Sequence, residues 1–293
     1  MDNSKKEKRR FGDRRDGKLI RDLDALHFVT GIIYPNRCDN EAYIGEKIDL
    51  TAINKYLEEK NKDNPEYKYN LFQVILTAIV KTLTLRPKMN RFIVNGNFYQ
   101  RNEVSAAFVV KKLFHDDGAE GLAFLHMKDE DTIDTIHNTI YKKISAGKSD
   151  KMDSTSGSMD FLNKMPRFIS KSLIKLMMIL ERHGKLPQFL ISSDPYYSSV
   201  VLSNLGSIKM KSGYHHLTNW GTCSMIVLIG EKKLYPFFDD DGNVTMKEAV
   251  ELGLTIDERL ADGYYYSKTM RLLRTLLQNP WLLDEPLSKD VEY

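Results

Sequence analysis

The residues with the clearest chemical potential lie in one short stretch near the end of the chain. There, Asp257, Glu258 and Arg259 follow an apolar run, and Asp262 and Gly263 precede a helical pattern. An Asp–Gly pair often starts a helix, because Asp can cap the first turn and Gly tolerates unusual backbone angles. Charged residues between apolar flanks also suit a catalytic turn, so this stretch alone leaves both interpretations open.

A second group of polar residues lies where an apolar strand is predicted to stop, at Ser203, Asn204 and Gly206. Ser, Asn and Gly are normal turn residues, so a plain turn is the ordinary interpretation. The functional interpretation is a hydroxyl at a strand end that donates a hydrogen bond to an oxyanion. The local pattern by itself favours the turn.

Metal-binding patterns are not convincing in this sequence. His215 and His216 are adjacent, and neighbouring residues on a strand point to opposite faces, so the two rings are not expected to share one metal. Cys38 and Cys223 lie far apart and in no metal-ligand spacing. Nucleophile-elbow, P-loop and dinucleotide-binding fingerprints do not occur. We therefore expect no metal site.

Hydrophobic patterning predicts an α+β fold, with a mixed β-sheet flanked by helices. Hairpins, with Asn95–Gly96 as the strongest turn signal, argue against a strict alternation of strands and helices. Helices are predicted over 49–62 with Asp49 as N-cap, 70–85 with Asn70 as N-cap, 129–148, 161–184 and 264–278. Strands are predicted over 27–37, around Asn95–Gly96 in 90–112, and over 121–128, 196–208, 222–233 and 244–258, with a turn at 236–243 and a linker at 149–160.

Composition is that of an ordinary globular protein. The chain has 293 residues, of which 42% are hydrophobic and 28% charged, with a net charge of only +3. This charge gives no general case for a nucleic-acid or anionic-membrane partner. Basic residues cluster over 1–18, where the interleaved Glu7, Asp13 and Asp16 favour a flexible, solvated arm over a nucleic-acid contact. We expect one domain over 19–285 and a loose tail over 286–293.

Location follows from the same features. Two distant cysteines and no apolar segment after Met1 lead us to expect a reducing cytoplasm. No apolar run approaches the roughly 20 residues that a membrane span needs, so we expect no membrane contact.

The polar groups together resemble a known family. A strand-end S-N-L-G is followed by an apolar strand that ends at Gly230, and then by D-x-R-x-x-D-G over 257–263 before an apolar helix. This order is similar to the catalytic domain of 2-oxoacid dehydrogenase acyltransferase subunits and to the chloramphenicol acetyltransferases. The family's N-P-x-x-L matches 279–283, and its P-x-x-N segment with the following strands resembles 87–110. The resemblance covers roughly 19–283.

The resemblance implies a trimer with active sites between subunits, in a channel that coenzyme A enters from one end and the acyl acceptor from the other. Ser203 would then stabilise the tetrahedral oxyanion, with Asn204 beside it. Asp262 and Gly263 would be structural, and Arg21 is the tentative ion-pair partner of Asp262. Acyl-coenzyme A is the implied substrate, and the acceptor would be a small molecule or carrier-bound.

One departure from the family's motif leaves two functional interpretations open. The family writes its hallmark as D-H-R-x-x-D-G, and its catalytic His falls on Glu258. An ordinary Glu, with a pKa near 4.3, is a poor base for a thiol near 8.5. The base could be Glu258 with a pKa raised by burial, or His215 or His216. The chain also lacks the D-K-A lipoyl-lysine motif. Two hypotheses follow: a stand-alone acyltransferase with altered machinery, or an inactive homologue that keeps the trimer and the coenzyme A channel.

Overall fold

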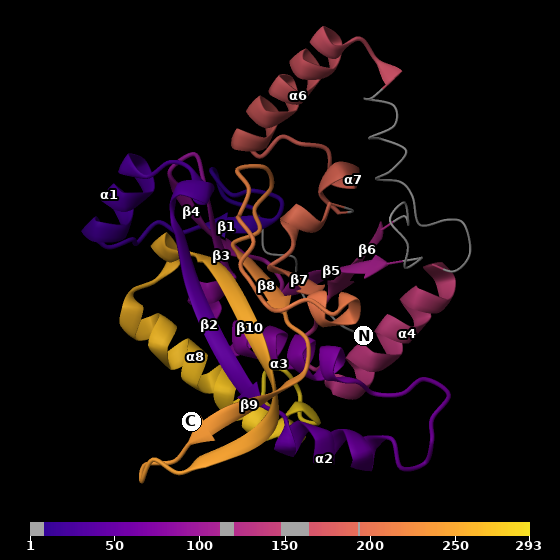
Figure 1. The fold of residues 1–293 in the computed structure, drawn as a ribbon. Coiled ribbons are helices and arrows are strands. Elements are labelled where there is room, and N and C mark those ends of the chain that lie inside the picture. The colour runs from indigo at the N-terminus through magenta and orange to yellow at the C-terminus, as the bar shows by residue number, and fades with distance from the viewer. Residues whose placement is uncertain (1–8, 112–119, 148–163, 193) are drawn as a thin grey trace, which may run out of the picture.

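A mixed β-sheet forms the centre of the fold (Figure 1). The computed structural model describes residues 9–111, 120–147, 164–192 and 194–293. The strand order is β2-β10-β8-β7-β5-β6, with β9 paired to β10. β5 pairs with β7 and β7 with β8 in parallel, whereas the other pairs are antiparallel. The strands are β2 (Glu41–Asp49), β5 (Ser105–Lys111), β6 (Glu120–His126), β7 (Val200–Asn204), β8 (Met225–Ile229), β9 (Lys233–Phe238) and β10 (Val244–Asp257).

Helices cover one face of this sheet and bury the main hydrophobic core against it. These helices are α2 (Thr51–Lys60), α3 (Leu71–Leu85), α4 (Ile133–Gly147) and α8 (Gly263–Gln278). Three more, α1 (Ala25–Ile33), α6 (Arg167–Arg182) and α7 (Gln188–Ile191), lie at the upper end of the view in Figure 1. The predicted α+β plan with a mixed, helix-flanked sheet is confirmed.

The long helix α3 is the buried axis of the helical layer. Asn70 accepts a hydrogen bond from the backbone of Gln73, whose side chain in turn accepts one from the backbone of Asn70, which confirms the predicted cap. Lys81 is fully buried, and its ammonium donates to the carbonyls of Leu282 at 2.8 Å and Pro286 at 2.8 Å. The N-P-W-L-L segment, η6 (Pro280–Leu283) with the residue before it, is therefore tied to the core by one lysine.

A second, three-stranded sheet lies beside the first, in the order β1-β4-β3. Its strands are β1 (Gly17–Leu19), β3 (Arg91–Val94) and β4 (Asn97–Arg101). Asn95 and Gly96 join β3 to β4 with φ values of 51° and 74°. Positive φ at both positions is what a two-residue hairpin turn requires, so the predicted hairpin is confirmed.

The strand predicted over 27–37 is wrong, because this segment begins with helix α1. The Asp24 carboxylate accepts a hydrogen bond from the backbone of His27 at 3.0 Å and caps the helix. Short apolar runs rich in β-branched residues do not distinguish strand from helix by periodicity. The turn predicted over 236–243 is also too long, because β9 continues to Phe238 and pairs with Val244. Strand β2, at the edge of the sheet, was not predicted.

Both chain ends are better packed than the sequence suggested. Within the arm expected over 1–18, Arg14 is buried and pairs with Glu181 at 2.7 Å. In the tail expected over 286–293, Leu287 is fully buried, and its backbone donates to the carbonyl of Asp131 at 2.8 Å. The predicted linker at 149–160 lies outside the described residues. Among the helices that the structure describes, none has the length and apolar character to cross a bilayer.

Candidate active site

The charged turn after β10 is organised around a buried ion pair. The carboxylate of Asp257 is fully buried and receives two hydrogen bonds from the Arg259 guanidinium, from Nε at 2.8 Å and from Nη2 at 2.6 Å. Arg37 lies on the other side, with its Nε 3.8 Å from the same carboxylate. The Tyr266 hydroxyl donates to the carbonyl of Asp257 at 2.7 Å. The turn is therefore a rigid scaffold built on Asp257.

The predicted pairing of Asp262 with Arg21 does not occur. Asp262 is exposed, and its carboxylate caps α8 by accepting from the backbone of Tyr265 at 2.8 Å. Hydrogen bonds from this helix start lower the pKa of the carboxyl group. Arg21 instead lies 3.2 Å from the Asp13 carboxylate. The buried, arginine-paired carboxylate of this turn is Asp257, five residues earlier in the chain.

Glu258 lies between the two partners of the buried pair and is itself exposed. Its backbone N–H donates to the carbonyl of Asn40 at 3.0 Å. Its carboxylate makes no hydrogen bond or ion pair with the residues that the structure describes. Asp257 and Arg259 therefore fix the backbone at this position and leave the Glu258 side chain facing outward.

Ser203 lies near the end of β7 and is half-buried. Within the described part of the chain, its hydroxyl has no hydrogen-bond partner, so it is free to donate. The close packing of the following turn explains the glycine of S-N-L-G: a Cβ at Gly206 would lie 2.6 Å from the carbonyl oxygen of Gly230. The strand end and the turn are thus held against the end of β8.

Strand register shows that Ser203 and Glu258 are far apart within one chain. Ser203 lies opposite Leu228 on β8, and Leu228 lies opposite Gly253 on β10. Glu258 follows Gly253 by five residues, which corresponds to about 17 Å along the strand at roughly 3.4 Å per residue. The two side chains cannot act on the same atom in one chain.

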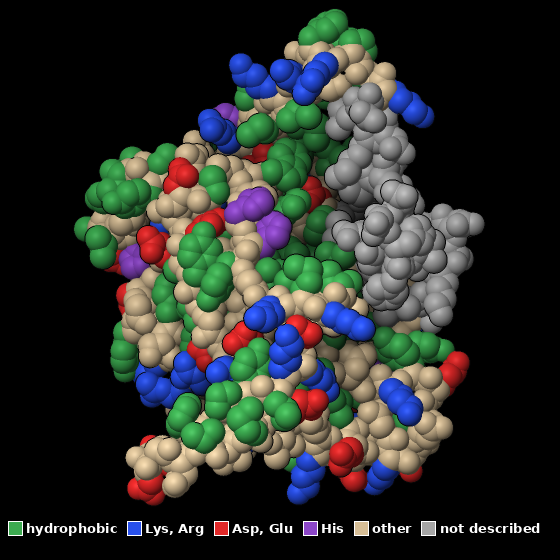
Figure 2. Space-filling view, viewed as in Figure 1, with side chains coloured by type: hydrophobic (Ala, Val, Ile, Leu, Met, Phe, Trp, Pro, Cys, Tyr) green, Lys and Arg blue, Asp and Glu red, His purple; other side chains and the backbone are tan. Residues whose placement is uncertain are grey.

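The histidines lie on a loop over the exposed face of the sheet edge. The loop 209–217 passes so close to β10 that a Cβ at Gly253 would lie 1.8 Å from the carbonyl oxygen of Gly213. Further along, the backbone of Leu217 donates to the Glu41 carboxylate on β2. The two histidines thus lie over β10 and β2, two and three strands away from β7. Figure 2 shows a neighbouring pair of His side chains exposed on this face.

His215 has a defined tautomer because of one hydrogen bond. Its Nδ1 lies 2.8 Å from the carbonyl oxygen of His216, and the two rings stack with their centroids 4.5 Å apart. A carbonyl only accepts, so Nδ1 must carry the proton and donate it. In the neutral ring, Nε2 then has a free lone pair. His215 is therefore exposed, oriented and able to accept a proton.

A large cavity opens beside the Ser203 strand end, with a volume of about 1090 Å³. Asn204, Lys209 and Lys232 line it on the sheet side, and Tyr67 and Tyr69 line it on the helical side. The ring of Tyr69 stacks on His137 with a centroid distance of 3.8 Å. Sequence reasoning missed these tyrosines and lysines, because aromatic and basic residues in loops carry no pattern that distinguishes a binding wall from an ordinary surface.

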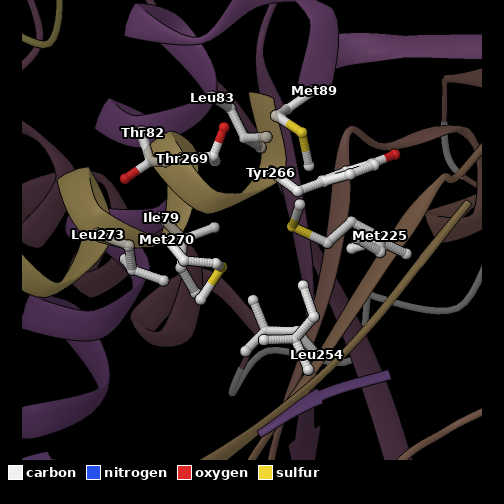
Figure 3. A pocket seen from close by; sticks show the side chains of 12 residues that line it. Ile79, Thr82, Leu83, Met89, Met225, Leu254, Tyr266, Thr269, Met270 and Leu273 are labelled. Carbon is white, nitrogen blue, oxygen red and sulfur yellow. The ribbon is translucent and has the colours of Figure 1, made fainter. Parts of the chain in front are cut away.

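A second cavity, shown in Figure 3, is only about 20 Å³ in volume and lies inside the core between α3, α8 and the sheet. Its walls are mostly apolar, with Met89, Met225 and Met270 among them. An apolar void of this size is a packing defect that stays dry. It is not a candidate site.

Metal chemistry receives no support from the geometry. In the described ranges of the chain, no group of three or more His, Cys, Asp or Glu side chains could hold an ion. The candidate functional side chains are Ser203, His215 and Glu258. The candidate binding cavity is the large one lined by Asn204, the residue after Ser203.

Comparison with known proteins shows that the fold is of the acyltransferase type. Residues 184–284, which include every one of those three side chains, match the family 2-oxoacid dehydrogenases acyltransferase (catalytic domain). The resemblance found in the sequence is thereby confirmed. A search of curated proteins found no match.

Solved structures of this family share the fold. A probable dihydrolipoamide acetyltransferase from Listeria monocytogenes is 16% identical, with 87% of this chain and 89% of that chain covered and a TM-score of 0.56. A dihydrolipoamide acetyltransferase from Azotobacter vinelandii, studied for the roles of a serine, a histidine and an asparagine in its catalytic mechanism, is 13% identical, with 91% and 94% covered and a TM-score of 0.57. A chloramphenicol acetyltransferase is 10% identical, with 89% and 99% covered and a TM-score of 0.55.

Proposed function

We propose that this protein transfers an acyl group between coenzyme A and a small thiol or hydroxyl acceptor, at sites shared between the chains of a homotrimer. The observation that carries the proposal is the position of Ser203. Its free hydroxyl lies at the end of β7, and the next residue, Asn204, lines a cavity of about 1090 Å³ whose wall also carries Tyr67, Tyr69, Lys209 and Lys232. The similarity to acetyltransferases at 10–16% identity supports the fold on which this position depends.

The cavity has the chemistry that a coenzyme A thioester requires. The Tyr67 and Tyr69 rings offer an aromatic surface for the adenine ring. Lys209 and Lys232 supply ammonium groups for the phosphates. An extended pantetheine arm bound along this cavity would bring the thioester carbonyl to the end of β7, where Asn204 lines the wall and Ser203 is the preceding residue.

In the proposed reaction, Nε2 of His215 takes the proton from the acceptor's thiol or hydroxyl as its sulfur or oxygen attacks the thioester carbonyl. Ser203 donates a hydrogen bond to the oxyanion that forms, which is stabilised more than the starting carbonyl. Collapse of the intermediate breaks the bond between the carbonyl carbon and the sulfur of coenzyme A. The leaving thiolate then receives the proton from the imidazolium.

The strand order within one chain supports assembly. The loop that carries His215 lies over strands two and three places from β7, so we expect Ser203 to meet a histidine of another copy. Exposed apolar surface that a second copy could cover is available on α1, where Leu26 is 70% and Phe28 56% exposed. Figure 2 shows this green patch beside the charged turn. The trimer itself is the assembly that the family resemblance implies.

An inactive homologue is the second candidate, and Glu258 is the observation that favours it. This carboxylate occupies the place of the family's catalytic histidine and has no partner that would orient it within the described residues. Such a protein would bind coenzyme A without transferring from it.

One assay separates the two candidates. It measures acyl transfer from acetyl-coenzyme A to a panel of thiols, alcohols and amines, and the readout is the free coenzyme A thiol that is released. We expect turnover with at least one acceptor, reduced by about 10²-fold or more in Ser203→Ala. The control is Ser172→Ala on α6, whose hydroxyl bonds only to its own helix at Phe168. Binding of coenzyme A without any turnover would favour the inactive homologue.

A further inference from the structure

A strongly basic groove lies at the N-terminal part of the described chain, beside β1 and β4, and none of the residues assigned to acyl transfer lines it. Its volume is about 930 Å³. The exposed cations that line it are Arg9, Arg10, Arg15, Lys18 and Arg21. No other cavity of this chain is lined by so many guanidinium groups, among those that the structure describes.

The acidic residues of this region already have hydrogen-bond or ion-pair partners. Asp13 accepts from the backbone of Arg10 at 2.8 Å and from that of Leu19 at 3.0 Å. Asp16 pairs with Arg14 at 2.9 Å. The acids interleaved in the arm therefore shape its backbone and hold Arg14 in place. By contrast, the guanidinium groups of Arg10 and Arg15 have no ion pair with any described residue.

A buried cation adds to the positive potential. Arg101 is buried, and its guanidinium donates to the carbonyl of Tyr197 at 2.8 Å and to that of Thr222 at 2.6 Å. No carboxylate bonds to it in the described part of the chain, and its Nε has no hydrogen-bond partner there. Burial, together with the neighbouring Arg37 and Arg14, lowers the pKa of Arg101 to about 10. It is still charged at neutral pH, so a positive charge that is only partly offset by the nearby Asp16 lies beneath the groove.

We infer that this groove binds a small molecule that carries several linked phosphates. Arginine forks match phosphate oxygens in geometry and charge, and clustered cations of one sign concentrate anions in a concave site. The volume falls in the range of small-ligand pockets. None of the residues that line the groove is aromatic, so it lacks the stacking platforms on which single-stranded nucleic acids depend.

Inorganic tripolyphosphate is the probe that tests this inference, by calorimetric titration of the full chain at two salt concentrations. We expect saturable binding at one site per chain, weakened about tenfold or more in the double variant Arg10→Gln/Arg15→Gln. A matched control, Lys171→Gln/Lys175→Gln, removes the same charge from exposed positions of α6 and should change the affinity less than about twofold. Thermal unfolding of both variants checks that the fold is kept.

Three results would overturn the inference. They are no saturable binding of tripolyphosphate to the wild-type chain, an equal loss of affinity in the two double variants, and tighter binding of a single-stranded oligonucleotide or an acidic peptide than of tripolyphosphate. The groove contains none of the residues assigned to acyl transfer, so the outcome is independent of the proposed function.

Discussion

Arg259 holds Asp257 in a two-point ion pair across the intervening Glu258, with donor–acceptor distances of 2.8 and 2.6 Å. Both partners are buried, whereas the residue between them is exposed. The D-x-R part of the family hallmark is therefore a clamp that sets the backbone of the central position. The family resemblance places a histidine where this chain has Glu258, and the clamp on either side of that position is present here.

The clamp should dominate the stability of this turn. Removal of the carboxylate leaves the buried guanidinium groups of Arg259 and Arg37 without their counter-charge, so Asp257→Ala should lower the free energy of unfolding by about 3–5 kcal/mol. Asp262→Ala removes only an exposed helix cap and should cost about 1 kcal/mol. Urea denaturation of both variants measures the difference. Equal losses of unfolding free energy in the two variants would show that the Asp257 and Asp262 carboxylates contribute equally to stability.

Lys81 should be a second residue whose substitution lowers the stability of the fold. Lys81→Met fills a similar volume but leaves the carbonyls of the half-buried Leu282 and Pro286 without their donor. Each unsatisfied buried acceptor costs about 1–3 kcal/mol, so the free energy of unfolding should fall by at least roughly 2 kcal/mol. The exposed Lys171→Met is the matched control. Unchanged stability in Lys81→Met would mean that the ammonium does not tie η6 to α3.

The assignment of the base predicts a ranking among three variants. His215→Asn should reduce the rate of acyl transfer by about 10²–10⁴-fold, because a general base is lost. His216→Asn and Glu258→Gln should reduce it less. His183→Asn, at the exposed C-terminal end of α6, controls for loss of any imidazole. If Glu258→Gln shows the largest loss, the carboxylate is the base and the histidine assignment is wrong.

Acid should destabilise the wall of the large cavity through His137. Burial against Gln73 and Tyr69 lowers the pKa of this imidazole from its ordinary value of 6.5. A lowered pKa in the folded state means that the unfolded chain takes up the proton first as the pH falls. The resulting stability is present above pH 6.5 and is lost as the pH falls below it. The unfolding free energy of His137→Gln should therefore fall less between pH 7 and pH 5 than that of the wild type. Parallel pH profiles would argue against this role.

Much of the framework could be predicted from local pattern, and the site geometry could not. The cap at Asn70, the Asn95–Gly96 turn and the helix start at Asp262 each depend on neighbouring residues, so the sequence reveals them directly. Which aspartate of the turn is buried depends instead on the fold, and the sequence analysis paired Asp262 with Arg21, whereas the buried pair is Asp257 with Arg259. Helix α1 was mistaken for a strand because its apolar run is too short for periodicity to decide.

The separation of the candidate site residues across the sheet was the feature hardest to predict from the sequence. Ser203, His215 and Glu258 lie in a span of 56 residues, which suggests proximity. The structure instead places Ser203 on β7, His215 on the loop over β10 and β2, and Glu258 after the end of β10. The proposal of a site shared between chains depends on this arrangement.

Subunit complementation tests the central claim most directly. Ser203→Ala and His215→Asn, each inactive alone, are co-expressed with different affinity tags, and mixed oligomers are isolated through both tags. Each site then needs an intact serine from one chain and an intact histidine from its neighbour. In a mixed trimer, one of the three interfaces pairs an intact serine with an intact histidine, so about a third of the sites should be complete. The account predicts that the mixed oligomers recover about a third of the wild-type transfer rate. Mixed oligomers as inactive as the two parents would contradict a site shared between chains.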